Sequence, residues 1–169
     1  MKDRRLAIIV LMMLLPAVSV FGFRRPNVLM VLVDDMVYSD LGCYGASIEA
    51  PNIDRLASYG LSYTCFYKTG RCWTTRASLM TGLFQHQVGK AISFGEKAPP
   101  AYQGNISREI PFISEVLHGE GYSTYDLGKL HLNSRFGEVE HSWPLGRRFD
   151  RSYCVVSQNY FLGNMSVTK

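Results

Sequence analysis

Two segments of the chain have the pattern of strands that end at charged side chains. Residues 27–33 (NVLMVLV) form a near-continuous apolar run, which Asp34 and Asp35 follow directly. Residues 122–127 have a similar pattern and lead into the sequence GKLH at 128–131. Such runs are typical of strands buried on both faces of a parallel sheet. We therefore predict two buried strands whose carboxyl ends, where α/β sheets collect ligands, carry polar groups.

The segments between and beyond these strands alternate in type. Residues 51–60 begin with proline, place apolar side chains on one face and end with glycine, which predicts a helix. Residues 61–67 alternate around aromatic side chains, as a strand does. Residues 85–101 are polar and rich in glycine and proline, so we expect a loop there, whereas 110–117 (IPFISEVL) are amphipathic and predict a helix. This order predicts an α/β layer fold with a mostly parallel sheet, and 143–161 show no clear period.

Length and composition indicate a signal peptide and the compartment in which the mature chain is found. The chain has 169 residues, which corresponds to one domain. Residues 1–22 combine basic side chains, a short apolar run and small residues, which predicts a cleaved signal peptide and a secreted or periplasmic mature chain, 23–169. The net charge of +4 falls to +2 once the leader's three basic residues and one acidic residue are removed. We therefore expect no nucleic-acid partner, and no membrane association after cleavage.

Four cysteines are relevant in an oxidising compartment: Cys43, Cys65, Cys72 and Cys154. They allow two disulfides in any of three connectivities, and at least one remains unpaired if Cys72 is reserved for chemistry. Their spacing is unlike that of a zinc site.

The stretch 70–82 (GRCWTTRASLMTG) reads as a loop that enters a short helix, with Thr74 and Thr75 as candidate N-caps. Cys72 then lies at the positive end of the helix dipole, and Arg76 lies four residues later on the same face. A sulfur in that position is biased toward reactivity, and an anion there would meet N–H groups and a guanidinium. The alternative is a buried cysteine beside a surface arginine.

The polar residues after the two predicted strands also have two interpretations each. Asp34 and Asp35 are paired oxygen donors suited to Ca²⁺ or Mg²⁺ if the backbone bends there, or else acids in a solvated turn. Lys129 and His131 could supply a fixed charge and a proton donor or acceptor, or else be a surface lysine and a partly buried histidine. His86, in the predicted loop, is assigned a structural role.

These signals occur in the order found in the N-terminal part of the sulfatases, which the chain resembles over about residues 25–161. The resemblance is carried by five ordered blocks: Pro26-Asn27 with the apolar run and Asp34-Asp35; DLGCYG at 40–45 with PNIDRLA at 51–57; CWTTRASLMTG at 72–82; LGKLH at 127–131; and WPL, RFD and NYF between 143 and 161. The resemblance implies an alkaline-phosphatase-like α/β fold, here truncated, and hydrolysis of small-molecule or glycan sulfate esters.

The resemblance also implies a role for each matching residue. Cys72 would be oxidised to formylglycine by a maturing enzyme; one hydroxyl of the hydrated aldehyde would attack sulfur, and the other would later expel sulfate. Arg76 would hold this diol, Lys129 would bridge diol and sulfate, and His131 would assist elimination. Asp34, Asp35 and the modified Cys72 would bind a metal ion, Ca²⁺ or alternatively Mg²⁺.

The chain departs from the family pattern at several points. Thr74 stands where the signature usually has proline and sometimes alanine, which puts conversion of Cys72 in question. Arg148 and Cys154 stand where glycine is common. Sulfatases typically have several hundred residues, and their later metal ligands match nothing here. We therefore expect a fragment of a longer protein or a degenerate copy, weakly active at best.

Other interpretations compete with a sulfate ester hydrolase. A cysteine-dependent phosphatase needs five residues between cysteine and arginine, whereas three separate Cys72 from Arg76. A nucleotide P-loop at Gly89-Lys90 lacks the required glycine at 84 and hydroxyl residue at 91. A phosphoester or phosphonate hydrolase of the same superfamily and an inactive remnant that only binds anions or metal remain as alternatives.

Overall fold

The computed structural model describes residues 25–92, 99–132, 141, 143–155 and 165–168. The predicted signal peptide, 1–22, lies outside the described residues. The chain divides into two compact units, 1–36 and 37–169, and each is described by itself.

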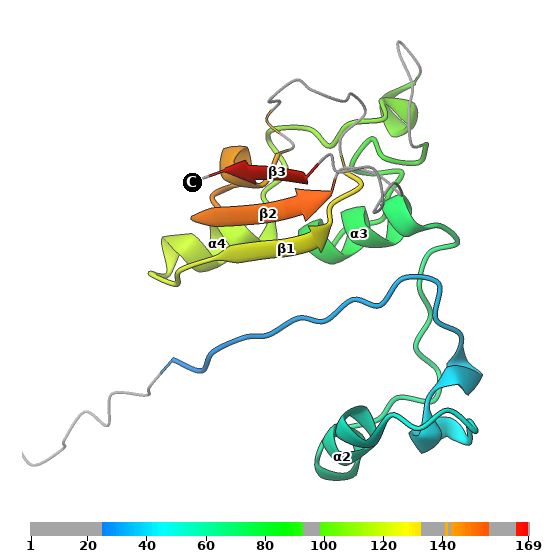
Figure 1. Ribbon diagram of the computed structural model, residues 1–169. Helices are drawn as coiled ribbons and strands as arrows, with labels where there is room; N and C mark the ends of the chain where they lie inside the picture. Colours follow the sequence, from blue (N-terminus) through cyan, green and yellow to red (C-terminus); the bar gives the residue numbers. More distant parts are fainter. Residues whose placement is uncertain (1–24, 93–98, 133–140, 142, 156–164, 169) are drawn as a thin grey trace, which may run out of the picture. The chain divides into compact units, whose positions relative to one another are not determined.

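A three-stranded sheet forms the centre of the second unit (Figure 1). Its order is β1 (Tyr125–Lys129), β2 (Arg151–Val155) and β3 (Met165–Thr168). β1 runs parallel to β2, and β2 runs antiparallel to β3. The prediction of an α/β fold is confirmed, although β1 begins three residues later than expected. β2 lies in a stretch whose hydrophobic pattern has no clear period, and β3 was not predicted.

The sheet has one covered face and one open face. On the covered face, Ser152 and Cys154 are 4 % and 2 % exposed. On the open face, the side chains of Tyr125, Leu127 and Tyr153 are 59 %, 76 % and 42 % exposed. The expectation that β1 is buried on both faces is therefore wrong for most of the strand, which lies at the edge of the described sheet. Only at its carboxyl end, at Lys129 and the paired Val155, is this second face buried as well.

Two helices accompany the sheet (Figure 1). The helix α3 (Cys72–Thr81) ends as predicted, with Gly82 at a φ of 71° after its last turn, but it begins at Cys72, ahead of the predicted caps Thr74 and Thr75. The helix α4 (Ile113–Gly119) begins three residues later than predicted, since Pro111 and the extended residue Phe112 precede it. Gly121 closes α4 at a φ of 80°: its N–H and that of the next residue bond back to the last turn, as in a Schellman motif.

The hydrophobic core joins these elements. Its buried members come from α3, from the segment before α4, from the residues after β1 and from β2: Ala77, Val88, Ile106, Phe112, Leu130, Leu132, Trp143 and Cys154. Leu132 and Ala77 are fully buried. The core therefore holds the start of α3 and the end of β1 in one packed body.

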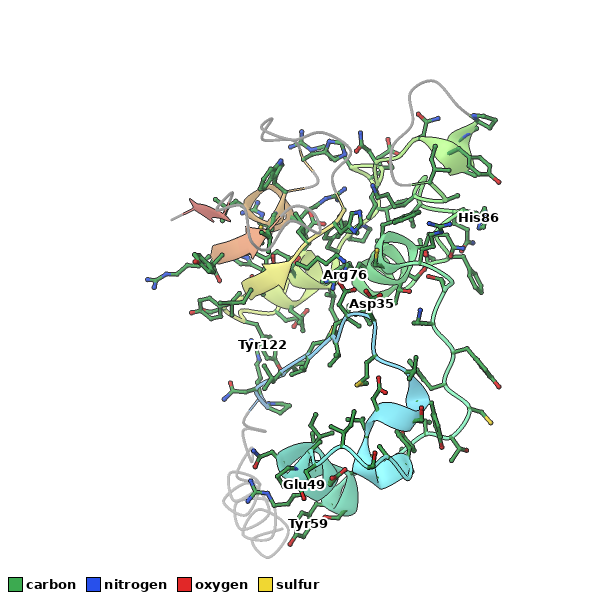
Figure 2. All side chains as sticks on the ribbon, turned by 45° about the vertical axis from the view of Figure 1, so that its right-hand side comes forward. Asp35, Glu49, Tyr59, Arg76, His86 and Tyr122 are labelled. Carbon is green, nitrogen blue, oxygen red and sulfur yellow. The ribbon has the colours of Figure 1, made fainter. Side chains whose placement is uncertain are left out.

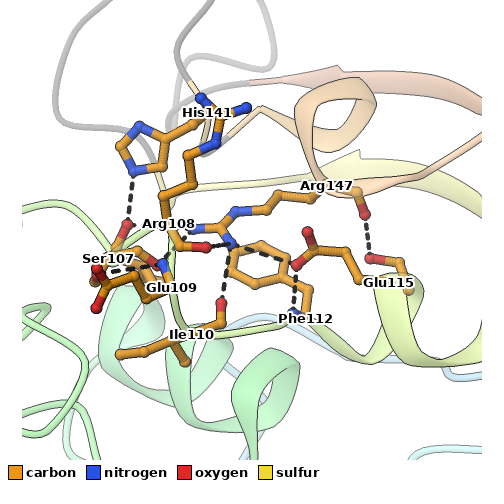
Figure 3. Close-up of polar contacts among 10 residues, drawn as sticks. Ser107, Arg108, Glu109, Ile110, Phe112, Glu115, His141 and Arg147 are labelled. Carbon is orange, nitrogen blue, oxygen red and sulfur yellow. Dashed lines mark hydrogen bonds and ion pairs between the residues drawn. The ribbon is translucent and has the colours of Figure 1, made fainter.

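A buried arginine, Arg147, ties a loop to this body (Figure 3). It lies at the end of the 3₁₀ turn η5 (Pro144–Arg147) and is 1 % exposed. Its guanidinium donates to carbonyls of one loop: Ile106 at 3.2 Å, Ser107 at 2.8 Å and Ile110 at 2.9 Å. It also pairs with the Glu115 carboxylate at 3.3 Å. Burial lowers the pKa of Arg147, and the Glu115 carboxylate opposes that shift.

Residues 37–67 form a small cluster around the helix α2 (Pro51–Tyr59), which confirms the predicted helix. Two 3₁₀ turns, η2 (Tyr38–Asp40) and η3 (Gly42–Tyr44), precede it. The Cys43 N–H donates to the Asp54 carboxylate at 2.8 Å, which fastens η3 to α2. The predicted strand at 61–67 does not form, and Tyr67 is 87 % exposed.

The first unit holds the strand prediction that the structure contradicts most clearly. Residues 27–33 have no strand structure, and all of them are exposed, Leu29 to 88 %. A strand forms only where its N–H and C=O groups bond to a neighbouring strand. The described sheet consists of β1, β2 and β3, so residues 27–33 have no strand partner in it.

The remaining connections are irregular. The predicted loop at 85–101 consists, in its described part, of turns and the start of η4 (Pro100–Tyr102). Within the part of the chain described here, every helix is too short or too polar to span a bilayer.

Candidate active site

The N-terminus of α3 is built by hydroxyl groups that reach back to the residue before the helix. Arg71, extended at φ −139° and ψ 160°, is the N-cap. The Thr74 hydroxyl accepts from the Arg71 N–H at 3.2 Å and donates to its carbonyl at 2.8 Å. The Thr75 hydroxyl bonds to the carbonyls of Thr69 and Arg71, each at 2.9 Å. The prediction that Thr74 and Thr75 are N-caps is therefore wrong; they lie inside the first turn and stabilise it from there.

Cys72 is the first residue of α3 and is half-buried. Its Sγ lies 3.2 Å from Nδ1 of His131, a residue 59 positions later in the chain. The Trp73 ring packs edge-on against the His131 ring, with centroids 5.6 Å apart. The sequence did not mark Trp73 as a site residue. The indole thus holds the imidazole beside the sulfur at the end of the helix where the dipole is positive.

His131 has an unusual backbone, with a φ of 49°. Such a left-handed conformation costs on the order of 1–3 kcal/mol for a residue other than glycine. Among the described residues, three non-glycine positions have positive φ: Asp35, His131 and Arg148. Two of these are candidate site residues. Strain of this kind persists where the surrounding structure fixes it, and it clusters at functional sites.

Arg76 lies one turn along α3 from Cys72 and is 8 % exposed. Its side chain is labelled in Figure 2. Its guanidinium donates a hydrogen bond to the main-chain carbonyl of Lys129, the last residue of β1. The Lys129 side chain is buried, with 8 % exposed. The structure therefore brings four predicted residues to the junction of α3 and β1: Cys72, Arg76, Lys129 and His131.

Asp34 and Asp35 belong to the first unit, and they lie on the predicted bend. Asp34 is half-buried and Asp35 is exposed, with a φ of 55° at Asp35. Within the described ranges, no three His, Cys, Asp or Glu side chains form a group that could hold a metal ion. Calcium takes 6–8 oxygen ligands, so these two carboxylates supply part of such a site only.

The other cysteines take no part in this junction. Cys43 and Cys65 are exposed, Cys154 is buried in the core, and no disulfide joins any of the four cysteines. The two disulfides considered from the sequence are not formed. His86 packs edge-on against Tyr102 at 6.0 Å, in keeping with a structural role.

One acidic residue near the junction was not anticipated from the sequence. Asp126 lies in β1, half-buried, and accepts a hydrogen bond from Ser152 of β2 at 3.4 Å. Burial raises the pKa of Asp126, while the Ser152 hydrogen bond and the Arg76 charge oppose that shift. The only signal in the sequence was a carboxylate within a predicted buried strand.

Comparisons with known proteins identify the family of the chain. A family model described as Sulfatase matches residues 26–159. Human arylsulfatase A is 39 % identical over 111 residues, which cover 64 % of this chain and 21 % of that protein. N-acetylgalactosamine-6-sulfatase of Rattus norvegicus is 33 % identical over 145 residues, 78 % of this chain and 28 % of that protein. The chain spans about a quarter of the length of such curated relatives.

Solved structures give the same result for the fold. The crystal structure of Ps i-CgsB superposes with a TM-score of 0.68 at 32 % identity, covering 79 % of this chain and 29 % of that one. Its complex with k-i-k-neocarrahexaose superposes with a TM-score of 0.63, also at 32 % identity, covering 73 % and 26 %.

Proposed function

Because this chain belongs to the sulfatase family, we propose that it provides the nucleophile and anion-binding side chains of a sulfuric ester hydrolase. The observation that carries this proposal is the 3.2 Å contact between Cys72 Sγ and His131 Nδ1. Cysteine at a helix N-terminus, histidine beside it and a buried arginine one turn away together suit attack on an anionic ester.

Cys72 is the residue that we propose is converted to formylglycine. It is half-buried at the start of α3, so its side chain is close to both the His131 ring and the helix N-terminus. A hydrated formylglycine supplies a hydroxyl nucleophile in place of the thiol. The proposed partner is therefore a formylglycine-generating enzyme acting on the chain, in keeping with export to the periplasm or outside the cell after removal of 1–22.

The neighbouring side chains then have defined tasks. Arg76, held through the Lys129 carbonyl, presents a fixed positive charge to a sulfate oxygen. Lys129 adds a second charge at the end of β1. His131 stands within hydrogen-bonding distance of the nucleophile position, and it exchanges a proton with the group there.

The described residues do not by themselves complete a calcium site. We propose Asp34 and Asp35 as two ligands of a Ca²⁺ ion, in keeping with their hard oxygen donors and the bend that carries them. A bound Ca²⁺ would supply positive charge to sulfate oxygens.

The substrate class proposed is a sulfate ester carried by a glycan or a small alcohol. A structural neighbour is solved in complex with the oligosaccharide k-i-k-neocarrahexaose, which supports testing a sulfated oligosaccharide first and an aryl sulfate second.

Mass spectrometry of the Cys72 peptide tests the proposal, after co-expression with a formylglycine-generating enzyme. We expect a peptide mass that corresponds to the aldehyde or its hydrate, and release of sulfate from an ester. Cys72→Ala should abolish sulfate release, while Cys65→Ala, at an exposed cysteine, should leave it unchanged. Thr74→Pro should raise the converted fraction, because proline fixes φ as the signature does.

Unmodified Cys72 in both the parent chain and Thr74→Pro, together with no released sulfate, would overturn the proposal. Faster release of phosphate from the matching phosphate ester would instead favour a phosphoester hydrolase of the same superfamily.

A further inference from the structure

Arg71, the residue before Cys72, carries an exposed side chain next to the candidate nucleophile. Its backbone is fixed, because its N–H donates to the Thr74 hydroxyl and its carbonyl accepts from the hydroxyls of Thr74 and Thr75. Its side chain lies over the Trp73 ring, with the guanidinium carbon 5.2 Å from the ring centroid. The main chain and the indole therefore both restrict the position of this positive charge.

A series of contacts links the Arg71 guanidinium to the nucleophile position. The Trp73 ring beneath it also packs edge-on against the His131 ring, with centroids 5.6 Å apart. Nδ1 of that imidazole lies 3.2 Å from Sγ of Cys72. Nε1 of Trp73 is buried and has no hydrogen-bond partner among the described residues, so the indole contributes through its ring and not through its N–H. One aromatic ring thus separates the guanidinium from the imidazole that contacts the sulfur.

The hydrogen-bond donors of the Arg71 side chain are available to a ligand. Within the part of the chain that the structure describes, this side chain makes the ring contact, and the guanidinium forms no ion pair and donates no hydrogen bond. A contact with a ring face leaves free the planar set of N–H groups with which arginine binds oxyanions through paired bonds. Arg76, in contrast, is 8 % exposed and donates to the Lys129 carbonyl. The chain therefore offers one buried and one exposed guanidinium close to Cys72.

We propose that Arg71 is a specificity-determining residue that binds a second anionic group of the substrate, beyond the sulfate ester that is cleaved. The substrate class is then a saccharide with at least two anionic substituents. This inference rests on the proposed function, since it assigns a subsite next to the same nucleophile. A sulfate that reaches the buried Arg76 and Lys129 leaves its alcohol on the solvent side, and there the Arg71 side chain is exposed.

The test compares, by calorimetry, disaccharides that differ only in their anionic groups: unsulfated, monosulfated, disulfated, and monosulfated with a carboxylate in place of the second sulfate. It uses the full chain expressed without a maturing enzyme, so that Cys72 remains a thiol and the ester is not consumed. We expect wild type to bind the disulfated compound about threefold to fivefold more tightly than the monosulfated one, the range of an exposed ion pair. This preference should fall at about 1 M salt, because screening acts most on exposed charges.

Three variants assign the preference to a residue. Arg71→Gln removes the charge and should remove the preference, whereas Arg71→Lys keeps the charge without the planar donors and should retain part of it. Arg55→Gln, at an exposed arginine of α2, is the matched control and should keep the wild-type preference. In a nitrogen-15 NMR spectrum, the Nε–H signal that Arg71→Lys removes should shift more with saturating disulfated compound than with the monosulfated one.

The carboxylate compound identifies the second anion. Tighter binding of both doubly charged compounds would support recognition of oxyanions in general. Tighter binding of only one would support the inference and restrict the second group to a sulfate or to a carboxylate.

Other outcomes would overturn the inference and leave the proposed function intact. Equal affinity of wild type for the monosulfated and disulfated compounds, both tighter than the unsulfated one, would do so. The same preference in Arg71→Gln as in wild type would assign the second anion to another cation, the exposed Lys68 among them. An unchanged preference with a lower converted fraction of Cys72 in Arg71→Gln, measured by mass spectrometry after co-expression, would assign Arg71 to recognition by the maturing enzyme.

A further outcome concerns the anion site itself. If wild type and all three variants have folded spectra and bind no sulfated disaccharide, both this inference and the anion site of the proposed function would be overturned.

Discussion

Two segments of this chain were predicted to be buried strands, and they reach different structures. Residues 125–131 form β1 and its continuation, pair with β2 and bury Leu130 to 4 % exposure. Residues 27–33 are more apolar, yet they form no ladder, and Leu29 is 88 % exposed. Apolar composition therefore indicates that a segment can be buried as a strand. Whether it is buried depends on a neighbouring strand with which it can pair.

The comparison also concerns the candidate site. At the end of β1, packing fixes a strained His131 beside Cys72 and holds Arg76 through a main-chain carbonyl. Asp35 has a similarly strained backbone, but it follows an exposed segment. The residues at the junction of α3 and β1 are thus positioned by a packed core, whereas Asp34 and Asp35 follow a segment whose apolar side chains are exposed.

The largest effect should come from the buried arginine that supports the packed region. Arg147→Met removes the guanidinium from three loop carbonyls and leaves Glu115 without its partner. Loss of one member of a buried ion pair costs about 3–5 kcal/mol. Urea unfolding, followed by tryptophan fluorescence, should show this loss. Arg151→Met, at an exposed arginine of β2, is the matched control and should change the free energy of unfolding by less than about 0.5 kcal/mol. Equal losses in Arg147→Met and Arg151→Met would show that the contacts of Arg147 with the loop carbonyls and Glu115 do not contribute to the free energy of unfolding.

A pair of leucines tests the comparison directly. Leu132→Ala, at a fully buried position, should lower the free energy of unfolding by about 2–5 kcal/mol, because a cavity remains in the core. Leu29→Ala, at an 88 % exposed position, should change it by less than about 0.5 kcal/mol. The same urea transitions measure both. A large loss for Leu29→Ala would mean that residues 27–33 are packed in solution, and the contrast between the two segments would fail.

Sequence reasoning succeeded where the signals are local. Pro51 and Gly60 bounded α2, Gly82 ended α3, and the spacing of Cys72 and Arg76 placed both on the first turns of that helix. It failed where long-range partners decide. No local sequence signal indicated that residues 61–67 would not pair with another strand, or that residues 151–155 would pair with β1.

The site shows the same division. Lys129 and His131 were predicted from their place after a strand, and the structure brings them to α3. Asp126 was not anticipated because its surroundings depend on Ser152 and Arg76, which are distant in sequence. The capping of α3 was assigned to the wrong residue, because Thr74 and Thr75 act through the backbone of Arg71 from inside the helix.

The smallest effect should come from Arg148, the strained position outside the candidate site. It directly follows η5 with a φ of 61°, a backbone conformation that glycine adopts without steric cost. Left-handed backbone costs about 1–2 kcal/mol for a residue with a Cβ, and glycine's greater freedom in the unfolded chain offsets part of that gain. Arg148→Gly should therefore raise the free energy of unfolding by about 0.5–1 kcal/mol. Arg148→Ala keeps the strain while removing the side chain, so it should bring no gain. An equal gain in both variants would assign the effect to the arginine side chain and remove the backbone argument.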